Sequence, residues 1–327
     1  MVIMNVIFLC DFIRMTLPAL RVVPEGIDPF CFTGRIWNRI MGLYDLFVFS
    51  ALLLSVECIA MAYVSCFIQR VSWTPMIAVI PFLVAFSIYN LNRKTDEDED
   101  AINRQDRFAF TKRYEIYLYY GALLSFAAAL ILSALYGIPS FLATAAPFIF
   151  GTLYSFRLLP EQAGYRRLKE IPAVKNIVVG LAWATFLAFL PIFLNHSTPD
   201  SKTAISFLLF FMWGFMASLI PDVRDKVGDA RAGVRTIPVI IGEARTRTLL
   251  TGVLLVLGIP AILYSILFLP PFTTGVLIAA NLYSHGCALL LDRDWLRDIL
   301  ADAISDGMYI CFAIAIIFII TFHLGLA

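Results

Sequence analysis

The sequence contains two short clusters of metal-binding residue types, each with the spacing of one helical face. The first cluster consists of Asn92, Asp96 and Asp100, at intervals of four residues. The second consists of Asp222, Asp225 and Asp229, at intervals of three and four residues. Residues at these intervals lie on the same side of an α-helix, and a step of four residues advances about 6 Å. Each cluster therefore predicts a row of oxygen atoms along one side of a helix.

Rows of carboxylates of this kind indicate a divalent cation. Neighbouring carboxylates repel one another, and their pKa values rise unless a cation neutralises them. Mg²⁺ prefers oxygen ligands and is typically held by one or two carboxylates together with substrate phosphates. We therefore expect the residues of both clusters to be metal ligands, and the two clusters to hold Mg²⁺ ions that clamp a diphosphate.

Basic residues near the two clusters could complete the binding of a diphosphate. The candidates are Arg104, Lys169, Lys175, Arg224 and Arg235. Lys and Arg side chains make charge-assisted hydrogen bonds to phosphate oxygens. Of these, Arg104, Lys169, Lys175 and Arg235 could each equally be an ordinary basic residue beside a membrane.

The elements that must position these residues are long apolar segments. Of the 327 residues, 60% are hydrophobic and 15% are charged, whereas soluble proteins have about 45–50% and about 25%. A helix crosses the bilayer core of about 30 Å with about 20 residues. Nine runs meet this requirement, at residues 43–67, 73–92, 116–136, 138–156, 172–194, 203–221, 246–269, 272–291 and 304–325. The sequence therefore predicts an all-α, polytopic membrane helical bundle with about nine transmembrane helices.

The distribution of basic residues supports this arrangement. With nine spans, all of the 25 Lys and Arg residues except Arg70 and Lys202 lie on one side of the membrane. That side is cytoplasmic by the positive-inside rule. We therefore expect residues 1–42 to be an N-terminal interfacial segment, and residues 43–327 to be a transmembrane domain with cytoplasmic acidic loops at 92–115 and 222–245.

The remaining polar residues give weaker indications. The six cysteines form no CxxC pair and no cluster with the three histidines, so neither a disulfide framework nor a zinc site is expected. The net charge of +1 provides no basic excess of the kind that indicates a nucleic-acid partner, and none is expected. Glu57 falls inside the first span, where a carboxylate is costly and usually faces the bundle interior. Asp302, Asp306 and His285 are further pocket candidates.

The acidic clusters and their surroundings resemble the UbiA superfamily of intramembrane prenyltransferases. The NxxxDxxxD pattern that starts at Asn92 is followed by Asn103 and Arg104, and the DxxxD pattern that starts at Asp225 is followed by a GVRTIPV run. The stretches 154–157 and 168–184 between them are also similar. The resemblance covers roughly residues 80–245 and extends to the rest of the chain by hydrophobic pattern.

This resemblance implies Mg²⁺-dependent transfer of an isoprenyl group from a prenyl diphosphate to a hydrophobic acceptor, aromatic or lipid-like, within the membrane. It implies catalytic roles for Asn92, Asp96, Asp100, Asp225 and Asp229, metal binding by these residues and Asp222, and diphosphate binding by Arg104, Lys169, Lys175 and Arg235. Arg93 and Gln105 stand where the family commonly has other residues. These departures leave the acceptor open.

Three other functions compete with prenyl transfer. The same ionisation chemistry could feed a membrane terpene cyclase, which only the product would distinguish. An ion-coupled transporter would typically bind its substrate near the midplane on interrupted helices, whereas most acidic residues here lie at helix ends, with Glu57 as the exception. A non-catalytic scaffold would have no need to concentrate repelling carboxylates.

Overall fold

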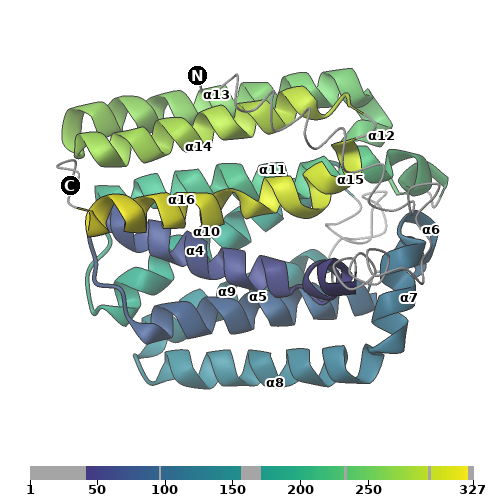
Figure 1. Cartoon of the computed structure of the whole chain (residues 1–327), viewed down its shortest axis with the longest axis horizontal. Coiled ribbons are helices and arrows are strands. Elements are labelled where there is room, and N and C mark those ends of the chain that lie inside the picture. The colour runs from purple at the N-terminus through teal and green to yellow at the C-terminus, as the bar shows by residue number, and fades with distance from the viewer. Residues whose placement is uncertain (1–41, 96, 156–170, 232–233, 294–295, 323–327) are drawn as a thin grey trace, which may run out of the picture.

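The computed structural model describes residues 42–95, 97–155, 171–231, 234–293 and 296–322, and every regular element within these ranges is a helix. The predicted interfacial segment at 1–42 therefore lies almost entirely outside the described residues. The long helices run side by side along the longest axis of the molecule, and the short helices α6, α7, α12 and α15 gather at one end (Figure 1).

Each of the nine predicted apolar runs overlaps one long helix. These are α4 (Leu52–Gln69), α5 (Pro75–Thr95), α8 (Glu115–Ala134), α9 (Ile138–Ser155), α10 (Val174–Leu194), α11 (Ser201–Arg231), α13 (Glu243–Phe268), α14 (Pro271–Leu290) and α16 (Ser305–Thr321). The first run, 43–67, begins before α4 and includes a turn at residues 50–51. By length and composition, α4, α5, α8, α10, α11 and α13 could each cross a membrane, and α9 and α16 contain shorter apolar helices. The chain is thus an all-α integral membrane protein, and the number of nine spans stays a prediction.

Two of the turns between long helices depend on glycine and proline. The connection from α8 to α9 contains Gly137 with φ of +104°, a conformation that glycine adopts without steric cost. Pro270 precedes α14, and Pro271 is its first residue, a position where the missing N–H of proline has no helical partner to lose. These tight turns make α8 and α9, and α13 and α14, packed neighbours.

The core of the bundle lies around α10 and α11. Phe186 and Leu190 of α10, and Phe210 and Met216 of α11, are almost completely buried. By contrast, α8 and α13 expose large apolar side chains such as Leu124, Ile131, Val256 and Leu267. Apolar exteriors of this kind suit contact with lipid tails, which are as apolar as the leucine side chain.

Two glycines allow α10 and α11 to cross with their backbones in contact. A Cβ atom on Gly214 would lie 3.0 Å from the Cα atom of Gly180, and a Cβ atom on Gly180 would lie 3.1 Å from the carbonyl oxygen of Phe211. Small residues at helix contacts permit this close approach in membrane proteins. The crossing brings Asn176 of α10 within hydrogen-bonding distance of Asp222 of α11, at 3.1 Å.

The polar segments 92–115 and 222–245, expected as loops, are largely helical. The first contains α6 (Glu97–Asn103) and α7 (Gln105–Arg113), and in the second α11 continues to Arg231 and is followed by α12 (Ile237–Ile241). The polar composition of these segments does not make them loops, because the short helices pack against one another and against α11. In α11, the side chains of Asp222 and Asp229 are buried.

We expect Gly214→Ala to destabilise the protein by about 1–3 kcal/mol, the usual cost of adding atoms to a close-packed contact. The added methyl group would meet the backbone of Gly180. Thermal unfolding of the purified protein in detergent measures the effect. The matched control is Gly252→Ala on α13, whose Cβ atom would meet nothing within 4 Å, so its unfolding temperature should not fall. Equal unfolding temperatures for Gly214→Ala and the unaltered protein would contradict the backbone contact.

Candidate active site

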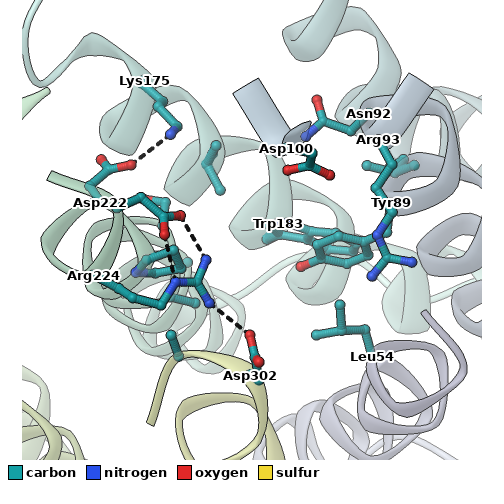
Figure 2. Close-up of a pocket in the computed structure, with 18 of the residues that line it drawn as sticks. Leu54, Tyr89, Asn92, Arg93, Asp100, Lys175, Trp183, Asp222, Arg224 and Asp302 are labelled. Atoms are coloured by element: carbon teal, nitrogen blue, oxygen red, sulfur yellow. Dashed lines mark hydrogen bonds and ion pairs between the residues drawn. The ribbon is translucent and has the colours of Figure 1, made fainter. Parts of the chain in front are cut away.

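A cavity of about 340 Å³ lies between the two acidic clusters. Its polar half is lined by Asn92, Asp100, Asp222, Asp225 and Asp229. Figure 2 shows Asn92 and Asp100 on one side of this half, and Asp222 with Lys175 on the other. Its apolar half is lined by Leu53, Leu54, Tyr89, Trp183 and Trp213. The structure therefore brings together two clusters that are more than 100 residues apart in the sequence.

The second cluster lies on a single helix, α11, as its spacing predicted. Asp222 is 3% exposed. Its carboxylate accepts hydrogen bonds from Lys175 Nζ at 2.7 Å and from Asn176 Nδ2 at 3.1 Å. Both donors are on α10, so the close crossing of α10 and α11 supplies the partners of this carboxylate.

The other two carboxylates of α11 have different partners. Asp225 accepts hydrogen bonds from Arg224 Nε and Nη2, both at 2.7 Å. Asp229 accepts a hydrogen bond from Asn103 Nδ2 at 3.1 Å and a longer one from Thr236 Oγ1 at 3.4 Å. Asp225 is thus paired with a full positive charge, whereas Asp229 is held by neutral donors.

The first cluster reaches the cavity through two helices. Asn92, near the end of α5, is exposed and lines the cavity. Asp100, on α6, is buried and accepts hydrogen bonds from Arg107 of α7, with Nε at 3.2 Å from Oδ2 and Nη2 bonded to Oδ1. Asp96 lies outside the described residues.

Four of the basic candidates occupy different environments. Lys175 lines the cavity and pairs with Asp222. Arg235 is exposed and is absent from the cavity lining of the described residues. Lys169 lies outside the described residues. Arg104 is only 5% exposed and donates from Nη1 to Asp302 at 2.7 Å, so its guanidinium is committed to another side chain.

Arg107 of the cavity lining was not singled out from the sequence as a ligand of a diphosphate, whereas Arg224 was a candidate. Arg107 follows Asp100 by seven residues, which is a helical interval, but α6 and α7 are separate helices. Arg224 lines the cavity next to Asp225 in sequence. Adjacent residues do not face each other on a helix, so the spacing gives no signal for this pair. The Arg224 side chain is long enough for its guanidinium to reach the carboxylate of Asp225.

Gly228 of α11 makes room for Asn103. A Cβ atom on Gly228 would lie 1.4 Å from Asn103 Oδ1 and 2.6 Å from Asn103 Cγ. The Asn103 amide therefore lies directly on the backbone of α11, where it donates to Asp229. A glycine within a helix usually costs stability, which is the signal in the sequence that this position has a packing role.

Asp302 was a pocket candidate in the sequence and does line the cavity. It lies in a π-helical turn, η4 (Leu300–Ile304), and its Oδ1 accepts hydrogen bonds from Arg104 Nη1 and Arg224 Nη1, both at 2.7 Å. Burial by itself raises the pKa of Asp302, but the hydrogen bond from Arg104 and the charges of both arginines outweigh it and hold the pKa below its usual value. Asp302 is therefore an anion in the folded protein.

The other pocket candidates lie elsewhere. Glu57 is buried in the core and is absent from the described cavity lining, although Leu53 and Leu54 of the same helix belong to it. His285 Nδ1 lies 2.8 Å from the carbonyl oxygen of Asn281, one turn earlier in α14. The side chain of Asp306 lies outside the described residues.

The described residues fit a metal ion that is shared with a substrate. Within the described ranges, no three Asp, Glu, His or Cys side chains lie close enough to hold a metal by themselves. Mg²⁺ needs no such set, because it commonly takes one or two carboxylates and completes its shell with water and phosphate oxygens. Carboxylate and amide oxygens on both sides of the polar half provide ligands of this type.

Comparisons with known proteins agree with this geometry. Residues 47–298 match the UbiA prenyltransferase family. A digeranylgeranylglyceryl phosphate synthase of Haloquadratum walsbyi is 30% identical over 131 residues, which are 40% of this chain and 43% of that protein, so the chain spans less than half of this relative.

Solved structures share the fold. A UbiA homolog from Archaeoglobus fulgidus bound to GPP and Mg²⁺ has a TM-score of 0.59 and 15% identity, covering 84% of this chain and 99% of that one. The structure of a UbiA homolog from the same organism bound to DMAPP and Mg²⁺ has a TM-score of 0.55 and 16% identity, covering 84% and 98%.

We expect Gly228→Ala to displace Asn103 from Asp229, because the new methyl group would occupy the position of the Asn103 amide. Overpacking should lower the free energy of unfolding by about 1–3 kcal/mol. Thermal unfolding in detergent again provides the measurement. The matched control is Gly286→Ala in α14, whose Cβ atom would meet nothing within 4 Å. If both variants unfold at the same temperature, the contact between Asn103 and α11 is not needed for stability.

Proposed function

The chain belongs to the UbiA prenyltransferase family, and we propose that it transfers an isoprenyl group from a prenyl diphosphate to a hydrophobic acceptor within the membrane, in a Mg²⁺-dependent reaction. The observation that carries this proposal is the division of the cavity. Carboxylates and basic side chains line one half, and aromatic and aliphatic side chains line the other. A prenyl diphosphate has the same division, with a highly charged head and an apolar tail.

The polar half would hold the diphosphate. On one side the metal ligands would be Asn92, Asp96 and Asp100, and on the other Asp222, Asp225 and Asp229. When bound, Mg²⁺ neutralises the leaving diphosphate and lowers the barrier to breaking the allylic C–O bond. Lys175, Arg107 and Arg224 line the same cavity, so these cations are candidate donors for the remaining phosphate oxygens.

The other basic candidates are not assigned to the diphosphate by the structure. Lys169 and Arg235 stay candidates for the diphosphate on the basis of the sequence. Arg104 is buried against Asp302, so we assign it to the support of that carboxylate and not to the diphosphate.

The apolar half would hold the prenyl chain and the reacting carbon. The rings of Tyr89 and Trp183 are stacked with centroids 5.8 Å apart, and Trp213 lies edge-on to Trp183 at 6.3 Å. Burial of a prenyl chain among such side chains is worth about 0.8 kcal/mol per CH₂. Aromatic faces also attract a cation, and an apolar cavity would limit the access of water to an allylic cation until the acceptor attacks.

We propose a lipid-like acceptor as the first to test. The Haloquadratum walsbyi relative is named as a synthase of digeranylgeranylglyceryl phosphate, a glyceryl phosphate lipid. An acceptor of this class would enter a membrane-embedded cavity from the bilayer, with its phosphate at the level of the polar half.

We expect the purified protein to release pyrophosphate from geranylgeranyl diphosphate only with Mg²⁺ and a geranylgeranylated glyceryl phosphate. Asp225→Asn and Asp100→Asn should each lower the rate by about 100-fold or more, because each removes charge stabilisation of the leaving group. The control Asp292→Asn alters an exposed ion pair with Arg247 and should leave the rate unchanged. Near-normal rates in both site variants would exclude the metal-clamp assignment.

The same assay separates the competing functions. Release without any acceptor, together with a cyclised hydrocarbon in the extract, would indicate a terpene cyclase. Release with a quinone-ring precursor instead of the glyceryl phosphate would retain prenyl transfer and change the acceptor class. Absence of release from every prenyl diphosphate would favour a transporter.

We also propose that the end of the bundle with the short helices faces the cytoplasm. Basic residues concentrate there in the sequence, and cytoplasmic segments of membrane proteins are enriched in Lys and Arg. A reporter fused to the N-terminus should then be cytoplasmic, and one fused to the C-terminus, after an odd number of spans, should be on the opposite side. Two reporters on the same side would contradict the nine-span arrangement.

A further inference from the structure

Asp302 links the second acidic cluster to a part of the chain that the family match does not include. The match ends at residue 298, and Asp302 lies beyond it in η4, the π-helical turn that precedes α16. Single π-helical turns are rare and often occur at functional sites. Here the turn places Asp302 in the wall of the cavity, next to Arg224 (Figure 2).

The Arg224 guanidinium is shared between two carboxylates. Its Nε and Nη2 atoms donate to the two oxygens of Asp225, and its Nη1 atom donates to Oδ1 of Asp302, all at 2.7 Å. The side chains of Arg224 and Asp302 are 8% and 7% exposed, so water screens these charges poorly. The position of the guanidinium is therefore set by the balance between Asp225 and Asp302.

Asp302 could accept a second hydrogen bond from Arg224. Its Oδ2 atom is buried and has no hydrogen-bond partner among the residues that the structure describes. A carboxylate can accept a guanidinium with both oxygens in a bidentate pair. Asp302 could thus bind the Arg224 guanidinium with both of its oxygens. Arg104 donates to the same Oδ1 atom and keeps the carboxylate in place.

Asp225 is a candidate metal ligand whose two oxygens are both engaged by a cation. A guanidinium in that position repels a divalent cation and competes for the same lone pairs. We propose that Asp302 is a positioning residue that acts through Arg224: it shares the guanidinium with Asp225 and thereby keeps Asp225 available to a divalent cation. This inference rests on the proposed function, in which Asp225 binds Mg²⁺ together with a diphosphate.

The test measures how much Mg²⁺ is needed to stabilise the protein in the presence of excess inorganic pyrophosphate. A ligand that binds the folded state raises the unfolding temperature, so the midpoint Mg²⁺ concentration is a readout that does not require turnover. Asp302→Asn keeps the size of the side chain and removes its charge. It should raise the midpoint by about tenfold, a typical coupling between contacting charged residues.

A double-mutant cycle distinguishes positioning from a general structural role. If Asp302 acts through Arg224, then Asp302→Asn should not shift the midpoint further in an Arg224→Gln background. A shift that persists in that background, or an unchanged midpoint in Asp302→Asn alone, would overturn the proposal. The control Asp292→Asn, in an exposed ion pair, should have the midpoint of the unaltered protein.

Two further outcomes are distinguishable. If the unaltered protein gains no stability from Mg²⁺ and pyrophosphate, the proposed function itself fails, and the role of Asp302 fails with it. If Asp302→Asn does not fold, Asp302→Glu replaces it: the carboxylate is retained but moved by one methylene, and a smaller shift in the same direction is expected. No shift in Asp302→Glu would then count against the sharing of Arg224.

Discussion

The arrangement of this site depends on how the repulsion among its carboxylates is offset at the end of an apolar bundle. Like charges in a poorly hydrated cavity destabilise one another unless positive or hydrogen-bonding groups compensate them. Each described carboxylate of the two clusters has such a partner: Arg107 for Asp100, Lys175 for Asp222, Arg224 for Asp225 and Asn103 for Asp229. Most of these contacts join different helices, so charge compensation also fixes α6, α7, α10 and α11 relative to one another.

Electrostatic attraction alone does not bring these partners within hydrogen-bonding distance. The donors on α10 reach Asp222 because Gly180 and Gly214 let the two helix backbones touch. Asn103 reaches Asp229 because Gly228 has no side chain. Three glycines therefore determine which donors Asp222 and Asp229 meet, and the chemistry of the polar half depends on the packing of the apolar bundle.

The long helices and the acidic clusters could be predicted because both follow from short-range periodicity. Apolar runs of about 20 residues specify membrane helices, and intervals of three and four residues place Asp222, Asp225 and Asp229 on one face of α11. The pairing of these carboxylates could not be predicted, because Asn103 reaches Asp229, and Lys175 reaches Asp222, through contacts between segments that are distant in the sequence. Arg104 illustrates the limit: a basic residue beside the first cluster suggested a ligand for a diphosphate, but tertiary structure buries it against Asp302.

The departure at Arg93 is explained by the same long-range packing. Arg93 directly follows Asn92 on α5, so the two side chains point in directions about 100° apart on the helix. Arg93 donates to the carbonyl oxygens of Val48 and Phe49, just before the chain passes through Ala51 with φ of +66° and continues as α4. A cation at the carbonyl end of a helical segment is stabilising. Arg93, Val48, Phe49 and Leu53 all line the cavity, so residue 93 shapes the part of the cavity wall that leads into α4. We therefore expect a difference from the family at this position to affect which acceptor fits the cavity, because the candidate metal ligands themselves are in place.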